Sequence, residues 1–187
     1  GTGCHSLALQ ERGLRVLAID VSPQALEILA GRGVEEYRQA DIFEFQGGPF
    51  DTLLLMMHGI GMVQDLAGLD RFLDRAHKLL KPGGQLLFDS LDVRCTDNPV
   101  HLAYQQANRR AGRYFGQIRL RFEYQGQMGP PFGWLHVDPG TLAEHAVLTR
   151  RRAAGSESTL RRRRASEPRQ SNEKSPPSWQ ALHRMAT

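Results

Sequence analysis

The chain has 187 residues, 40% of them hydrophobic and 24% charged, which is typical of a soluble globular domain with one substantial core. No apolar run approaches the roughly 20 residues that a membrane-spanning helix needs. The net charge of +4 is unevenly placed: residues 1–145 hold 14 Lys+Arg and 17 Asp+Glu, a net of −3, whereas residues 146–187 hold 10 and 3, a net of +7. We therefore expect neither a membrane nor a nucleic-acid surface on the first 145 residues.

Cysteine usage and the start of the sequence bear on the compartment. The chain has two cysteines, Cys4 and Cys95, without the close spacing of a metal site, and it opens in a glycine loop rather than in a basic and apolar leader. We expect a cytoplasmic protein that holds neither a disulfide nor a metal ion.

Helices and strands alternate over the first ninety residues. The apolar runs are short and bounded by Gly, Pro or Asp, as buried parallel strands are, and Ser22-Pro23 is typical of a helix start. The expected elements are helices over 2–10, 23–30 and 66–80, and strands over 16–19, 35–40, 50–57 and 85–88. This alternation predicts an α/β, Rossmann-like, doubly wound and mostly parallel sheet with ligands at the carboxyl ends of its strands.

The pattern of apolar and polar residues changes after Leu91. A helix is expected over 100–113, and a β-hairpin insertion at about 114–137, because apolar and polar residues alternate from Ile118 to Tyr124. Asp138-Pro139 then predicts the cap of a helix that begins near Thr141. Four aromatic residues of the insertion suit either a lid over a substrate or ordinary hairpin packing: Tyr114, Phe115, Phe132 and Trp134.

From about residue 146 the apolar periodicity ends. Runs of three and four arginines and a Ser-Pro-Pro-Ser segment follow, so we expect a partial catalytic domain over 1–145 and a basic, disordered tail over 146–187. A solvated tail is favoured over one that binds RNA. Because the arginine runs follow a proper helix start abruptly, we also hypothesise a reading-frame shift near Ala146.

A constellation of glycines and acids predicts a nucleotide site. Gly1 and Gly3 suit a strand-to-helix turn, where a ligand approaches the backbone and unpaired N–H groups face it. Asp20 ends the next strand, where a carboxylate can accept both ribose hydroxyls. Asp41 ends the strand after that, within reach of an adenine amino group, and two residues flank the ring: Val21 and Ile42. These features fit both a dinucleotide oxidoreductase and an S-adenosylmethionine enzyme.

Longer motifs separate these two enzyme classes. The chain contains five such motifs: Gly-Thr-Gly-Cys-His-Ser at 1–6, Ala-Ile-Asp-Val-Ser-Pro at 18–23, Ala-Asp-Ile at 40–42, Phe-Asp at 50–51 and Leu-Leu-Lys-Pro-Gly-Gly at 79–84. With these motifs, residues 1–145 resemble the class I S-adenosylmethionine-dependent methyltransferases, and the Lys-Pro-Gly-Gly turn before a strand is the most specific of them. The first strand of that family would precede Gly1, and the tail stands where its last two strands would be.

The resemblance implies transfer of the methyl group of S-adenosylmethionine to an acceptor, with enzymes of this kind contributing mostly positioning and desolvation. It implies cofactor binding by seven residues: Gly1, Gly3, Asp20, Val21, Asp41, Ile42 and Met57. His58 would lie near the methyl group, where it could orient or deprotonate the acceptor, although a structural role is equally open.

The acceptor is less well defined by the sequence. Met-His-Gly-Ile at 57–60 departs from the Asn/Asp-Pro-Pro-Tyr motif of methyltransferases that act on amide or adenine nitrogens, and we expect a small-molecule acceptor instead. Two alternatives stay open: an NAD(P)-dependent oxidoreductase and a non-catalytic, truncated product.

Overall fold

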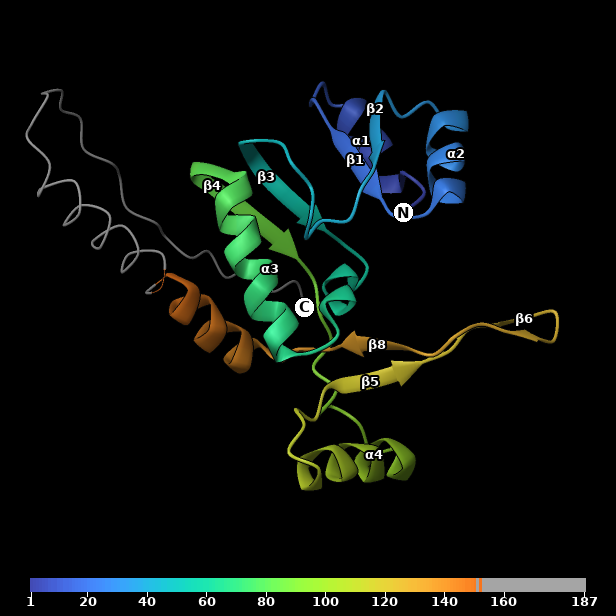
Figure 1. Cartoon of the computed structure of the whole chain (residues 1–187), viewed down its shortest axis with the longest axis vertical. Coiled ribbons are helices and arrows are strands. Elements are labelled where there is room, and N and C mark those ends of the chain that lie inside the picture. The colour runs from blue at the N-terminus through green and yellow to red at the C-terminus, as the bar shows by residue number, and fades with distance from the viewer. Residues whose placement is uncertain (151, 153–187) are drawn as a thin grey trace, which may run out of the picture. The chain divides into compact units, whose positions relative to one another are not determined.

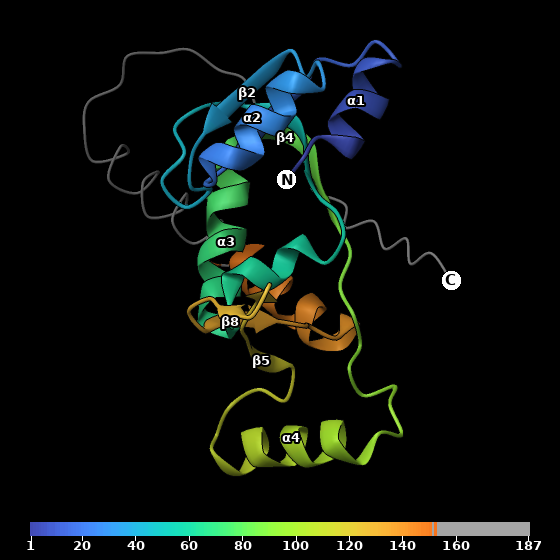
Figure 2. The ribbon, with the colours of Figure 1, turned by 90° about the vertical axis from the view of Figure 1, so that its right-hand side faces the viewer.

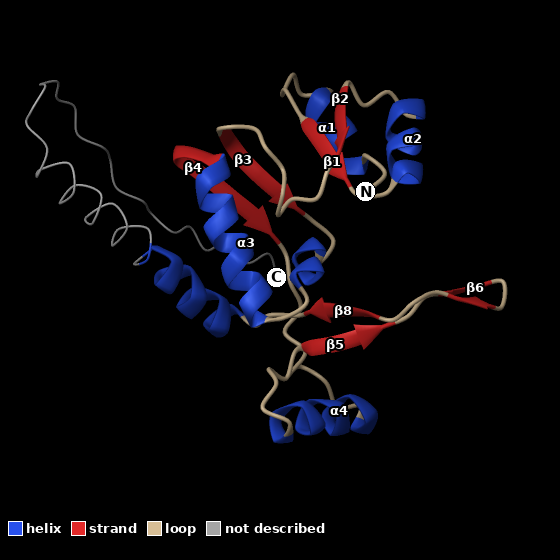
Figure 3. Ribbon diagram, viewed as in Figure 1, coloured by secondary structure: helices blue, strands red, loops and turns tan. Residues whose placement is uncertain are grey.

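The computed structural model describes residues 1–150 and 152, which fall into two compact units. The first unit is Gly1–Gly47, and the second begins at Gly48. Figure 1 traces the elements of each unit in chain order, and Figure 3 separates helices from strands. Helices and strands alternate in both units, which confirms the expected α/β class, while the expected domain boundary at residue 145 stays a prediction.

The first unit contains two helices and one parallel strand pair. Its elements are α1 (Cys4–Gln10), β1 (Leu17–Asp20), α2 (Pro23–Gly31) and β2 (Glu36–Gln39). The predicted start of α2 is confirmed, because the Ser22 side chain accepts a hydrogen bond from the Ala25 amide at 3.3 Å and Pro23 follows it. β1 and β2 pair in parallel, with Asp20 opposite Gln39 at their ends.

The second unit begins with a parallel strand pair and the helix that packs on it. Its first elements are β3 (Phe50–Leu55), the 3-10 helix η1 (Gly59–Val63), α3 (Leu66–Leu79) and β4 (Leu80–Phe88). The Asp65 side chain caps α3 by accepting from the Gly68 amide at 2.6 Å. The apolar face of α3 is buried, with Leu69 and Phe72 fully covered, so this helix supplies most of the core beside β3 and β4.

The strand that was expected after the Lys-Pro-Gly-Gly turn starts earlier than the sequence suggested. β4 begins at Leu80, so residues 81–84 belong to its first half and not to a separate turn. The Lys81 ammonium lies 2.8 Å from a carboxylate oxygen of Asp51, which joins this half of β4 to β3. The pairing register shifts between Phe50 and Thr52, which accommodates the Gly83-Gly84 bend.

The mostly parallel sheet was expected to lack its first strand, and the structure has partial sheets, although some strands that were expected to be buried are partly exposed. Among the described residues the strands form four separate pairs, of which β1–β2 and β3–β4 are parallel. Leu54 and Leu87, opposite each other in β3 and β4, are 38% and 42% exposed. An apolar run shows that a strand will form, but its burial depends on a covering layer that the run itself does not specify.

The rest of the second unit is a helix and two antiparallel hairpins. It comprises α4 (Pro99–Arg110), β5 (Gln117–Leu120), β6 (Glu123–Tyr124), β7 (Gln127–Met128) and β8 (Phe132–Leu135). β5 pairs with β8 as the expected hairpin, and α4 lies along β5 in both views of Figures 1 and 2. The expected strand over 118–124 is broken into β5 and β6, because Gln125 and Gly126, at φ of 49° and 75°, form a tight turn that pairs β6 with β7.

A last helix occupies residues 139–150, and residue 152 is also helical. It begins at the predicted cap, where an Asp138 carboxylate oxygen accepts from the Gly140 amide at 3.0 Å. Residues 146–150 and 152 of the expected tail are helical, and ion pairs from His145 to Asp70 at 2.8 Å and from Arg152 to Asp74 at 3.3 Å join this helix to α3. The rest of the tail lies outside the described residues, as does most of the segment that the frame-shift hypothesis concerns.

Candidate functional site

The glycine loop at the start of the first unit requires glycine for two separate reasons. Gly3 caps α1 with a φ of 85°, a conformation that residues with a Cβ rarely adopt. A Cβ at this position would also lie 2.7 Å from Leu29 and 2.8 Å from Val34, so the loop packs directly on the core of the unit. The second glycine of the predicted loop is thus fixed by both geometry and packing.

Asp20 stands at the carboxyl end of β1, beside that loop. Its carboxylate accepts hydrogen bonds from the amino group of Gly1 and, at 2.9 Å, from the Ser22 amide. Burial would raise the pKa of the Asp20 carboxyl, but these hydrogen bonds outweigh it and hold that pKa below its usual value. Asp20 is therefore an ionised acceptor beside the glycine loop, as the sequence suggested.

The neighbouring strand end carries the second predicted acid. The Ala40 amide donates to the Asp20 carbonyl at 3.0 Å, which places Asp41 at the same edge as Asp20. One oxygen of the exposed Asp41 carboxylate accepts from the Phe43 amide at 2.9 Å. Val21 is 61% exposed beside Asp20, and Ile42 is half-buried. The first unit thus holds six of the seven predicted cofactor residues, four of them at or just after the ends of its strands: Asp20, Val21, Asp41 and Ile42.

The other two predicted site residues, Met57 and His58, belong to the second unit and follow β3. Both have positive φ, 58° for Met57 and 59° for His58, although neither is a glycine. Residues other than glycine rarely adopt this backbone conformation, and the surrounding structure must hold it in place. Met57 is 78% exposed, whereas His58 is fixed by polar contacts.

The partner of His58 is Asp89, at the carboxyl end of β4. One Asp89 carboxylate oxygen, Oδ2, lies 3.1 Å from His58 Nδ1 and accepts from the His58 backbone amide at 3.0 Å. Asp89 therefore contacts both the backbone and the imidazole of His58. The sequence showed an acid after this strand but gave no sign that it would face His58.

A second imidazole lies against the first. The His136 ring, just after β8, is 5.9 Å from the His58 ring and edge-on to it at 78°. Burial lowers the pKa of His136, and the nearby His58 lowers it further, so His136 is neutral at pH 7. His136 Nδ1 and the other Asp89 oxygen, Oδ1, are buried without a hydrogen-bond partner in the described part of the chain.

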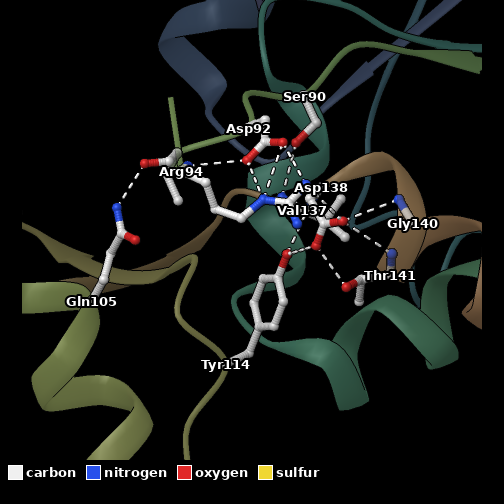
Figure 4. Close-up of polar contacts among 10 residues, drawn as sticks. Ser90, Asp92, Arg94, Gln105, Tyr114, Val137, Asp138, Gly140 and Thr141 are labelled. Carbon is white, nitrogen blue, oxygen red and sulfur yellow. Dashed lines mark hydrogen bonds and ion pairs between the residues drawn. The ribbon is translucent and has the colours of Figure 1, made fainter. Parts of the chain in front are cut away.

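Figure 4 shows the polar network that holds these segments together. The Val137 amide donates to the Ser90 hydroxyl at 3.0 Å, which ties the residue after His136 to the residue after Asp89. Next to it, Arg94 forms ion pairs with Asp92 at 2.6 Å and with Asp138 at 3.3 Å. The network joins the segment that follows β4 to the segment that follows β8.

Most aromatic residues of the insertion pack against neighbouring side chains, and one of them lines a hollow. Trp134 packs against η1 so closely that a Cβ on Gly61 would lie 2.0 Å from its ring, and Tyr114 stacks with Phe115 at 4.3 Å. Phe132 lines a hollow of about 590 Å³ between α4 and the β5–β8 hairpin. Its polar lining includes Tyr104, Asn108, Arg113 and Arg119. Ordinary hairpin packing thus accounts for most of the aromatic residues, and only Phe132 faces open space in this hollow.

Two absences complete the description of the site. Within residues 1–150 and 152, no three His, Cys, Asp or Glu side chains are grouped so that they could hold a metal ion. Over the same residues, no helix is long and apolar enough to cross a membrane.

Comparison with known proteins now adds to this geometry. Residues 1–88 match the family model of a methyltransferase domain. A solved S-adenosylmethionine-dependent methyltransferase from Bacteroides fragilis, in complex with S-adenosyl-L-homocysteine, is 35% identical, with a TM-score of 0.66 over 80% of this chain and 60% of its own. These matches support a class I S-adenosylmethionine-dependent methyltransferase.

Two further relatives agree with this family. The ubiquinone biosynthesis O-methyltransferase of Xylella fastidiosa is 32% identical over 100 residues, which are 49% of this methyltransferase chain and 39% of the relative. A solved S-adenosylmethionine-dependent methyltransferase from Methanosarcina mazei, 18% identical, shares the fold with a TM-score of 0.64 over 80% of this chain and 75% of its own. The chain spans less than two thirds of the Bacteroides and Xylella proteins. These relatives support the class I Rossmann-like fold and give no support to the oxidoreductase alternative.

Proposed function

We propose that this methyltransferase chain binds S-adenosylmethionine and transfers its methyl group to a small-molecule acceptor. The observation that carries the proposal is the ionised Asp20 carboxylate, which lies beside a loop that requires glycine at position 3. Asp20 would accept the ribose hydroxyls, and Asp41 would face the adenine. The remaining proposed cofactor residues are Gly1, Gly3, Val21, Ile42 and Met57. The bound cofactor supplies an electrophilic methyl group on its sulfonium.

The residues of the chain then have to position the acceptor and remove its proton. His58, whose Nδ1 lies 3.1 Å from Asp89 Oδ2, is the residue proposed to orient the acceptor or to accept its proton. A small acceptor is favoured because residues 1–145 have a net charge of −3 and so offer no electrostatic attraction to a nucleic acid.

Calorimetry with S-adenosylhomocysteine tests the cofactor assignment on the full chain. We expect Asp20→Ala to weaken binding by about tenfold or more, because a hydrogen bond to a charged group contributes about 1.5–3 kcal/mol. Asp97→Ala removes an exposed acid remote from the glycine loop in the sequence and serves as the matched control. An excess of NADH should leave the binding isotherm unchanged.

Two results would overturn the proposal. Displacement of S-adenosylhomocysteine by NADH would point to the oxidoreductase alternative. A full chain that is folded by circular dichroism but binds no S-adenosylhomocysteine would point to a non-catalytic product.

A further inference from the structure

The hollow beside α4 and the β5–β8 hairpin has the size and the lining of a small-molecule site. Its volume of about 590 Å³ falls within the range of roughly 300–1,000 Å³ that such sites occupy. Apolar and cationic side chains line it together: Ile118, Pro131, Phe132, Arg113 and Arg119. A lining of this kind suits a ligand that has an apolar body and an anionic group.

The two arginines bring positive charge to this hollow. In the described part of the chain, neither Arg113 nor Arg119 forms an ion pair with a carboxylate. Asp65 is the acid among the described lining residues, and its Oδ1 is engaged by the Gly68 amide at 2.6 Å. The charged groups of the lining therefore sum to +1, which matches a singly charged carboxylate better than a phosphate dianion. A guanidinium group binds a carboxylate with two parallel hydrogen bonds.

Contacts within the chain hold the wall that carries these arginines. The Asn108 side chain is 1% exposed, and its Oδ1 accepts from Arg113 Nε at 3.0 Å while its amide nitrogen donates to the Gln117 carbonyl at 2.6 Å. Both terminal nitrogens of Arg113 are left without a partner among the described residues. The Tyr104 hydroxyl accepts from the Arg119 backbone amide at 3.2 Å, so α4 is joined to β5 at this wall.

Gln64 lines the hollow in a backbone conformation that residues other than glycine rarely adopt. Its φ is 71° and its ψ is −39°, and strained residues of this kind cluster at ligand sites. A Cβ on Gly133 would lie 3.0 Å from the Gln64 Cβ, so Gln64 lies over a position of β8 that has no side chain. Gly133 is opposite Arg119 in the hairpin, and opposite residues share a face of the sheet. The space beside Arg119 on this face is therefore not filled by a side chain of β8.

We propose that this hollow is a binding site for an aromatic carboxylate. The guanidinium groups of Arg113 and Arg119 bind the carboxylate, and Phe132 packs against the ring of the ligand. Such a ligand has two sources: the methyl acceptor itself, or an effector that is not methylated. The binding site does not rest on the proposed function, whereas the assignment of its ligand as the acceptor does.

Calorimetric titration of the full chain without cofactor tests the site. The probes are naphthoate, meta-hydroxybenzoate and meta-aminobenzoate, each beside its uncharged amide. We expect each carboxylate to bind at least about tenfold more tightly than its amide, and Arg119→Gln to remove that preference. Arg119→Lys keeps the charge but not the planar fork, so its affinity should lie between the two. Arg121→Gln removes an exposed arginine that does not line the hollow, and as the matched control it should leave the affinity unchanged.

Backbone amide NMR of the full chain locates the bound carboxylate. We expect the largest shifts at Gln64, Arg119 and Gly133, and small shifts in the glycine loop over 1–6. Binding of no probe, equal affinity for carboxylate and amide, or an equal effect of Arg119→Gln and Arg121→Gln overturns the proposal. Shifts confined to the glycine loop also overturn it.

Labelled methyl transfer from S-adenosylmethionine separates the two sources of the ligand. Transfer to the hydroxyl or amino probe that falls in Arg119→Gln identifies the acceptor, and binding without transfer identifies an effector; both results support the site. Loss of S-adenosylhomocysteine binding would instead refute the proposed function, and the titration with carboxylates without cofactor would keep its meaning.

Discussion

Tyr114→Phe is the substitution whose effect the structure defines best. The Tyr114 hydroxyl donates to an Asp138 carboxylate oxygen at 2.6 Å and accepts from the Asp138 backbone amide at 2.9 Å (Figure 4). Asp138 is only 4% exposed, and it also caps the helix over 139–150. One oxygen atom thus joins the start of the hairpin insertion to the start of the last described helix.

The loss can be worked out from these two contacts. A hydrogen bond to a charged group contributes about 1.5–3 kcal/mol, and a buried amide left without a partner costs about 1–3 kcal/mol more. Thr141 still donates to the carboxylate at 2.6 Å and Arg94 remains paired with it, which softens the loss. We expect Tyr114→Phe to destabilise the second unit by about 2–4 kcal/mol.

The pH dependence has a definite sign. Burial would raise the pKa of the Asp138 carboxyl, but hydrogen bonds from Thr141 and Tyr114 and the charge of Arg94 lower it below its usual value. A carboxyl with a lowered pKa in the folded state stabilises the protein above about pH 4, and that stability is lost as the pH falls through the folded pKa. Tyr114→Phe should therefore reduce stability most at neutral pH and flatten the acid limb of the profile.

Urea denaturation and hydrogen exchange of the Asp138 amide measure this effect in the full chain. A loss of 2 kcal/mol corresponds to about 30-fold faster exchange of that amide when exchange occurs through opening of the second unit. Tyr124→Phe is the matched control, because the Tyr124 side chain is exposed and, within residues 1–150 and 152, only Gln125 is hydrogen-bonded to its hydroxyl. An equal effect of the two variants, or an unchanged acid limb in Tyr114→Phe, would refute the reasoning.

Two further substitutions test the packing of the second unit. Gly61→Ala should destabilise by about 1–3 kcal/mol, because its Cβ would lie 2.0 Å from the Trp134 ring, whereas Gly31→Ala, which meets open space, should be nearly neutral in the same melt. Phe72→Ala should lower the free energy of unfolding by about 3–5 kcal/mol in urea denaturation, because the ring of this α3 residue is 0% exposed. A loss below about 1 kcal/mol would contradict that packing.

Much of the local structure could be predicted because it depends on neighbouring residues. The Ser22-Pro23 helix start, the Asp138 cap and the hairpin of β5 with β8 are confirmed. Elements whose form depends on distant partners were harder to predict. The sequence did not show that β4 would begin at Leu80, that strand 118–124 would break, or that Leu54 would stay exposed.

The sequence by itself indicated the resemblance to methyltransferases and the strand edge proposed for the nucleotide, because glycine loops and acids at strand ends lie at fixed positions relative to local elements. The tertiary structure decided which side chains surround His58. Asp89 and His136 are 31 and 78 residues beyond it in the numbering, and no local pattern links them. Their meeting depends on the parallel pairing of β3 with β4 and on the Ser90 to Val137 hydrogen bond, which are long-range contacts.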